Sequence, residues 1–216
     1  MKKQLKGIMV GLLTVGLLAG CSSNTDAGKA VEGNTEPEKT VSQESKLDKD
    51  IAFIEKYGKV TVLADGSDYT LEGNDNIGYE MSNVKVVKIE DITETGKDNI
   101  EYALETDSLP DTIYAVIGSE KRANKTDEVI EFMGIVKMVA GSKQYDAVYE
   151  DFVQEDNGEG SQMMDGVEME NNFGFVIEDP NIDSVKFMLA SAFDSETFTH
   201  DYLKETTFKI DLTKVK

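Results

Sequence analysis

Apolar and polar residues alternate along much of the chain beyond Gly58, which is the pattern of half-buried β-strands. The last run is the clearest, because Phe208, Ile210 and Leu212 face one way and polar residues lie between them. The runs that predict strands are 60–64, 67–71, 78–81, 84–89, 113–119, 128–133, 135–139, 144–148, 173–177, 185–189 and 208–212. Many short strands joined by Gly, Asn and Asp turns predict a mainly β fold, an antiparallel sandwich with one solvated face on each sheet.

Three local features refine this pattern. Asp65-Gly66 is a strong hairpin dipeptide between the first two runs, so we expect those two strands to pair. Val86-Val87 breaks the alternation and marks a candidate β-bulge. Asn124-Lys125-Thr126 lies between two runs and predicts a turn.

A short helix is predicted before the first strand. Leu47, Ile51 and Ile54 follow one another at helical spacing, and Gly58 is a typical C-terminal stop. The spacing predicts a helix over residues 46–57. Between residues 22 and 44 the chain is a mixture of Ser, Thr, Asn, Gly and acids, which cannot bury enough apolar surface to fold. We therefore expect a disordered tether over residues 21–45.

The first twenty residues are typical of a targeting segment. Lys2, Lys3 and Lys6 form a positive region, and residues 7–19 form an apolar run shorter than the roughly 20 residues that a spanning helix needs. The sequence Leu18-Ala19-Gly20-Cys21, which contains the only cysteine, resembles the lipobox of bacterial lipoproteins. The resemblance implies cleavage after Gly20 and a diacylglycerol, with palmitate-type acyl chains, on the Cys21 thiol. The alternative is an ordinary signal peptide or membrane anchor that ends in a cysteine.

This interpretation divides the chain into three parts and gives it a location. They are a lipoprotein signal peptide (1–20), a lipidated tether (21–45) and a β-sandwich domain (46–216). A diacylated Cys21 would hold the domain on the outer face of the cell membrane, since two acyl chains anchor firmly. The formal net charge of -20 argues against nucleic acid as a partner, because nucleic acid is itself negative.

Part of the domain is similar to a known group. Residues 114–126 and 129–132 form a strand, an Asn-Lys-Thr turn and a returning strand, and residues 140–145, 172–177 and 185–189 follow in a matching order. The pattern resembles Ig-like domains of Gram-positive extracellular lipoproteins, a largely uncharacterised group with a secreted immunoprotective mycobacterial antigen as one relation. Over residues 77–213 the resemblance implies an Ig-like β-sandwich displayed at the cell surface, with no catalytic residues to carry over. The chain has no Trp and no cysteine pair, unlike antibody-type domains.

Candidate catalytic chemistry is sparse. His200 is the only histidine, and the chain contains no G-x-S-x-G, H-E-x-x-H or P-loop motif. We expect His200 to face solvent or to be bonded locally, and the protein not to be an enzyme. A hydrolase in which His200 meets two carboxylates remains a lesser alternative.

Two segments are candidates for binding, one acidic and the other rich in methionine. Glu155, Asp156 and Glu159 surround a glycine and form a candidate calcium site, although they lack the EF-hand spacing. No cofactor is expected unless calcium binds at these acids, and a calcium-binding lipoprotein is the main alternative function. Met163, Met164 and Met169 crowd residues 161–171 and are candidates for partner contact, because flexible methionines suit adaptable surfaces. The expected function is a non-catalytic binding module for an extracellular protein, a wall polymer or a small ligand.

Overall fold

The computed structural model describes residues 51–153 and 160–215. The predicted signal peptide, the tether and Cys21 lie outside these ranges, as do the first residues of the predicted helix. The candidate calcium ligands Glu155, Asp156 and Glu159 also lie outside them. The described part is mainly antiparallel β-structure with packed sheets, which confirms the predicted fold class. No helix in the described part is long and apolar enough to span a membrane.

The elements follow the predicted runs closely, with several additions. In chain order they are α2 (Ala52–Glu55), β1 (Lys59–Gly66), β2 (Tyr69–Thr70), β3 (Ile77–Glu90), α3 (Glu94–Leu104), β4 (Thr112–Asn124), β5 (Ile130–Glu131), β6 (Ile135–Ala140), β7 (Lys143–Asp146), β8 (Gln162–Met163), β9 (Glu168–Ile177), β10 (Ser184–Leu189), β11 (Ala192–Asp194), β12 (Asp201–Leu203) and β13 (Thr206–Lys214). The α3 helix and the short strands β8, β11 and β12 were not predicted by the alternation.

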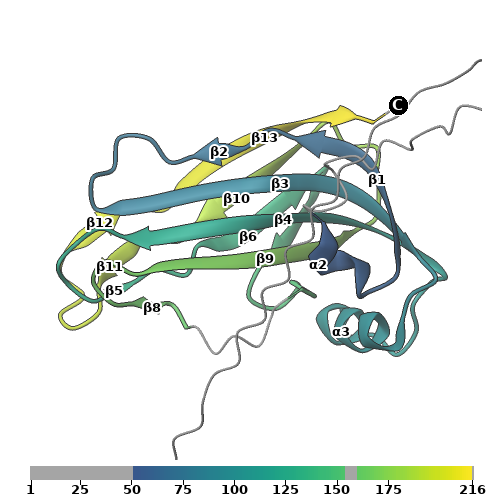
Figure 1. Cartoon of the computed structure of the whole chain (residues 1–216), viewed down its shortest axis with the longest axis horizontal. Helices are drawn as coiled ribbons and strands as arrows, with labels where there is room; N and C mark the ends of the chain where they lie inside the picture. Colours follow the sequence, from purple (N-terminus) through teal and green to yellow (C-terminus); the bar gives the residue numbers. More distant parts are fainter. Residues whose placement is uncertain (1–50, 154–159, 216) are drawn as a thin grey trace, which may run out of the picture. The chain divides into compact units, whose positions relative to one another are not determined.

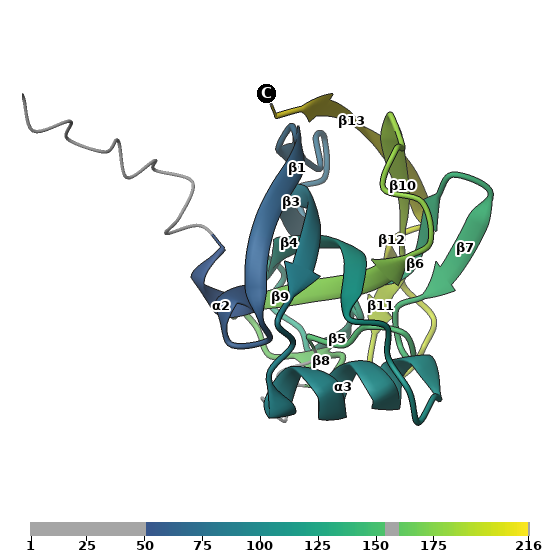
Figure 2. The same cartoon turned by 90° about the vertical axis from the view of Figure 1, so that its right-hand side faces the viewer.

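Two sheets contain these strands, and every pairing is antiparallel. The larger has the order β7-β6-β10-β13-β1-β3-β4-β9 with β2 on β3, and the smaller has the order β12-β11-β5-β8. Figure 2 shows β1, β3 and β4 on one side of the core and β13, β10 and β6 on the other. Between β1 and β13 only residues 64–66 pair with residues 212–214. The small sheet lies at one end of the sandwich (Figure 1).

The layer of β1, β3, β4 and β9 is buried on both faces. Its inner face contributes Val86 to the core between the layers. Its outer face contributes Val87 to a second core, which also contains Ile54 from α2 and Ile100 from α3. Both valines are fully buried. The break in alternation at Val86-Val87 therefore reflects burial on both faces of β3.

The pairing of β1 and β3 nevertheless changes register opposite these valines. The shift occurs between Val62 and Ala64 of β1. A second irregularity lies in β3 between Ser82 and Lys85, where Asn83 has a φ of 55°. The bulge predicted at Val86-Val87 is thus displaced to the partner strand and to an earlier position in β3.

The hairpin predicted at Asp65-Gly66 is wrong. β1 continues through Gly66 and pairs with β3 and β13, whereas β2 pairs with β3. A Cβ atom on Gly66 would lie 2.7 Å from Cγ2 of Ile210 on β13. The glycine therefore permits the close approach of two strands and does not form a turn.

The predicted turn after β4 is confirmed, and Asn124 holds it. Its Oδ1 accepts hydrogen bonds from the backbone N–H of Thr126 at 3.0 Å and from the Thr126 hydroxyl at 2.8 Å. Its Nδ2 donates to the carbonyl oxygens of Glu128, Met163 and Met164. One side chain thus fixes this turn and the chain around β8.

Candidate functional site

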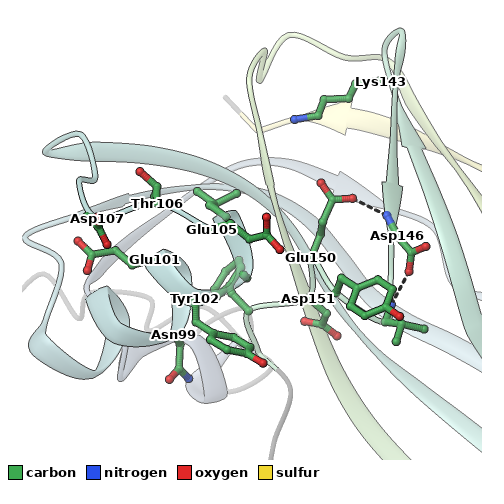
Figure 3. A pocket seen from close by; sticks show the side chains of 15 residues that line it. Asn99, Glu101, Tyr102, Glu105, Thr106, Asp107, Lys143, Asp146, Glu150 and Asp151 are labelled. Atoms are coloured by element: carbon green, nitrogen blue, oxygen red, sulfur yellow. Dashed lines mark hydrogen bonds between the residues drawn. The ribbon is translucent and has the colours of Figure 1, made fainter.

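A cleft of about 950 Å³ lies between α3 and the segment that follows β7 (Figure 3). We call it the α3 cleft. One wall consists of Asn99 and residues 101–107, from the end of α3 and the loop beyond it. The other consists of residues 146, 148–152 and the side chain of Lys143 at the start of β7. The two walls are about forty residues apart in the sequence, so the cleft exists only in the folded domain.

The α3 wall is fixed at both ends of the helix. Thr93 caps the N-terminus by accepting a hydrogen bond from the N–H of Gly96 at 3.1 Å. Glu105 ends the helix in the left-handed conformation, with a φ of 50°, a position where glycine is usual. The last turn leaves Tyr102 largely in solvent, with 85% of the residue exposed. Its ring and the Glu105 carboxylate border the cleft (Figure 3).

The opposite wall is a tight turn held by two carboxylates. Glu150 accepts a hydrogen bond from the N–H of Asp146 at 2.6 Å, and Asp146 accepts one from the N–H of Val148 at 3.0 Å (Figure 3). The N–H of Glu150 also donates to the carbonyl oxygen of Asp146 at 2.8 Å. The turn presents Tyr149, which is 74% exposed. Local hydrogen bonds therefore hold this second aromatic residue at the cleft.

Asp151 attaches this wall to the sheet. Its Oδ1 accepts hydrogen bonds from the N–H groups of Gly174 on β9 at 2.8 Å and of Val153 at 2.9 Å. The N–H of the neighbouring Phe152 donates to the carbonyl oxygen of Gly174 at 3.0 Å. Burial raises the pKa of the Asp151 carboxyl to about 7, although both hydrogen bonds act to lower it. The ring of Phe152 packs edge-on against Tyr57, with 5.4 Å between centroids, and so joins the wall to the second core.

The lining of the cleft is strongly acidic. Its carboxylates come from both walls: Glu101, Glu105, Asp107, Asp146, Glu150 and Asp151. Lys143 is the one base in this lining, and its Nζ lies 3.4 Å from Glu178 and 4.9 Å from the centre of the Tyr145 ring. A concave surface on which one sign of charge predominates concentrates the electrostatic potential, so the cleft favours cations.

The methionines predicted to contact a partner are mostly unavailable. Met163 and Met169 are 1% and 7% exposed, and both belong to the core between the layers. Their flexible side chains fill the end of the sandwich. Of the three, only Met164 is exposed. Of the three methionines predicted to contact a partner, Met163 and Met169 are therefore excluded by burial, and Met164 stays a candidate.

His200 is exposed and lies outside the α3 cleft. Its ring contacts that of Tyr202, with 4.6 Å between centroids. The nearby Asp194 carboxylate accepts hydrogen bonds from the N–H groups of Glu196, Thr197 and Thr199, and from the Thr197 hydroxyl. These bonds hold the pKa of Asp194 well below its usual range. The carboxylate thus stabilises the loop between β11 and β12.

Within the described ranges, no group of three or more His, Cys, Asp or Glu side chains is arranged to hold a metal ion. The calcium site expected at Glu155, Asp156 and Glu159 falls in the segment between those ranges and stays a prediction. The α3 cleft was not predicted from the sequence. Its carboxylates are a few of 42 in the chain, and no motif distinguishes them.

No protein-family model matches the chain, and no curated protein matches it. Among solved structures, the chain is similar to the crystal structure of a functionally unknown protein from Listeria monocytogenes EGD-e. The two share 12% sequence identity with a TM-score of 0.50, and the match covers 76% of this chain and 93% of that chain. At this identity the likeness supports a shared fold alone.

Proposed function

We propose that the protein is a lipid-anchored extracytoplasmic surface protein that acts as a non-catalytic binding module through the α3 cleft. The lipobox-like sequence Leu18-Ala19-Gly20-Cys21 supports the anchor and the location. The observation that carries the binding role is the cleft itself, with Tyr102 and Tyr149 exposed at its two walls. Tyrosines are enriched at binding surfaces because they combine a large apolar face with a polar tip.

The chemistry of the lining supports binding over catalysis. The one imidazole of the chain, on His200, lies outside the cleft. Asp146, Glu150 and Asp151 each accept backbone hydrogen bonds that hold the wall in place. These carboxylates shape the cleft and give it charge, which suits recognition of a ligand.

Site-directed photocrosslinking on intact cells tests this function. A photoreactive phenylalanine analogue replaces Tyr102 in the full chain, and a matched variant carries it in place of Phe198, which is also exposed, at 67%. Phe198 lies in the loop between β11 and β12, outside the cleft lining. We expect a discrete adduct with an extracellular component from position 102 and a weaker one, or none, from position 198. Absence of an adduct at 102, or equal adducts at both positions, would contradict binding of an extracellular component at the cleft on cells.

A further inference from the structure

Among the described residues, the carboxylates of the α3 cleft form no ion pair with a lysine or arginine. Some acids elsewhere in the described part do pair with lysines, as in Lys121–Glu168 at 2.7 Å and Lys88–Glu90 at 2.8 Å. No described ion pair includes any of the six acids that line the cleft. The cleft therefore concentrates negative charge that no described ion pair neutralises.

Asp151 favours a bound cation for a reason that is independent of the other five acids of the α3 cleft. Its carboxyl is partly buried against β9, and its described hydrogen-bond donors are two neutral N–H groups. A desolvated carboxylate without a cationic partner is costly to the folded state. A positive group bound in the cleft would offset part of that cost.

The two exposed tyrosines indicate what kind of cation fits. Tyr102 and Tyr149 offer aromatic faces at opposite walls. An aromatic face attracts an ammonium or guanidinium group by about 0.5–1 kcal/mol at exposed sites. It also packs against the methylene stem of a lysine or arginine side chain. An inorganic ion has no methylene stem to pack against the rings, so the lining favours an organic cation.

The size of the cleft and the spread of its charges favour a ligand with several positive groups. A volume of about 950 Å³ lies near the upper end of the roughly 300–1,000 Å³ of small-ligand sites. Glu105 and Asp107 belong to one wall, while Asp146 and Glu150 belong to the other. A single amine would meet only some of these carboxylates.

We infer that the α3 cleft binds a lysine- or arginine-rich segment of a partner polypeptide. The inference rests on the proposed function, since it names the ligand class of the same cleft. The aromatic faces would hold the side-chain stems, and the carboxylates of both walls would meet the charged ends.

Binding of labelled hexalysine to the full chain in a neutral detergent tests this inference. The cleft variant is Glu105→Gln with Glu150→Gln, which keeps side-chain shape and leaves an oxygen to accept from Asp146. The matched control is Glu80→Gln with Glu170→Gln, an equal change of net charge at exposed positions outside the α3 cleft. We expect the cleft variant to bind at least about tenfold more weakly and the control to stay within about twofold of the wild type. Higher salt should weaken binding, because screening acts on exposed charges.

Two further measurements test whether the tyrosines contribute to binding and whether the ligand is a polypeptide or a small polyamine. Tyr102→Leu with Tyr149→Leu should weaken hexalysine binding several-fold while circular dichroism shows an unchanged fold. Equal loss in the cleft and control variants would overturn the inference, because binding would then follow net charge alone. Spermine binding as tightly as hexalysine would overturn it too, in favour of a small polyamine.

Hexalysine binding does not depend on where the protein lies in the cell. Failure of the photocrosslinking alone would therefore count against the proposed function and not against this chemistry.

Discussion

Asp151 shows how one carboxyl can attach a binding wall to the sheet and also make it sensitive to pH. Its Oδ1 accepts from Gly174 and Val153, and burial raises the pKa of the group from 3.8 to about 7. The folded chain therefore holds this proton more tightly than the unfolded chain does. For this group, the free energy of unfolding falls as the pH rises from about 4 to about 7.

Replacing Asp151 with asparagine tests this dependence. The amide keeps an oxygen for the two N–H donors and removes the buried charge. We compare the free energy of unfolding of Asp151→Asn with that of the wild type. The difference, variant minus wild type, should be about 1–3 kcal/mol larger at pH 8 than at pH 4. Urea unfolding at a series of pH values measures the difference. A difference that stays constant with pH, or that moves in the opposite direction, would show that Asp151 does not titrate as described.

Single residues also show why the candidate site was not predictable. Glu105 occupies a left-handed helix end where sequence rules look for Gly or Asn. Asp151 accepts a hydrogen bond from Gly174, on a strand more than twenty residues away. Tyr149 follows a run that was predicted as a strand, but β7 ends at Asp146 and the chain turns. Local patterns carry no information on such distant contacts.

At the scale of elements, the strands were predictable and α3 was not. Long strands such as β4, β9 and β13 each contain a predicted run. The run in β13 alternates because one of its faces is solvated, whereas β4 and β9 are buried on both faces and are marked by their apolar residues. In α3, by contrast, Gly96, Ile100 and Ala103 are the buried residues, so only two apolar side chains mark its buried face. The strands β8, β11 and β12 have two or three residues, which is too short for a period to be recognised.

The position of α3 depends on a close contact at Gly96. A Cβ atom at this position would lie 2.3 Å from the carbonyl oxygen of Tyr57. We expect Gly96→Ala to destabilise the domain by about 1–3 kcal/mol, because the helix must move away from Tyr57. Lys97→Ala, at the next and exposed position of the helix, should be neutral or slightly stabilising, because alanine is the better helix former. Urea unfolding of both variants measures the effect. A stabilising effect of Gly96→Ala would show that α3 does not pack so closely.

At the scale of the whole molecule, β1 joins the two layers because it pairs with both β3 and β13. One layer is buried on both faces, and α3 covers its outer face at the cleft. The alternating pattern predicted the sandwich, but it could not predict which strands exchange layers. That choice depends on contacts such as Gly66 against Ile210. The overall charge of -20 gives the protein an acidic character, and the α3 cleft concentrates it where both walls meet.

We propose that a lipid on Cys21 holds this domain outside the cell, and labelling with radioactive palmitate tests this proposal most directly. Cells that produce the full chain or Cys21→Ser are grown with the label, and the protein is recovered by an affinity tag at its C-terminus. Because Cys21 is the only cysteine in the chain, its thiol is the only thiol that can carry the lipid. We expect label on the wild-type chain and none on Cys21→Ser. Equal labelling of the two chains, or no label on the wild type, would contradict the anchor.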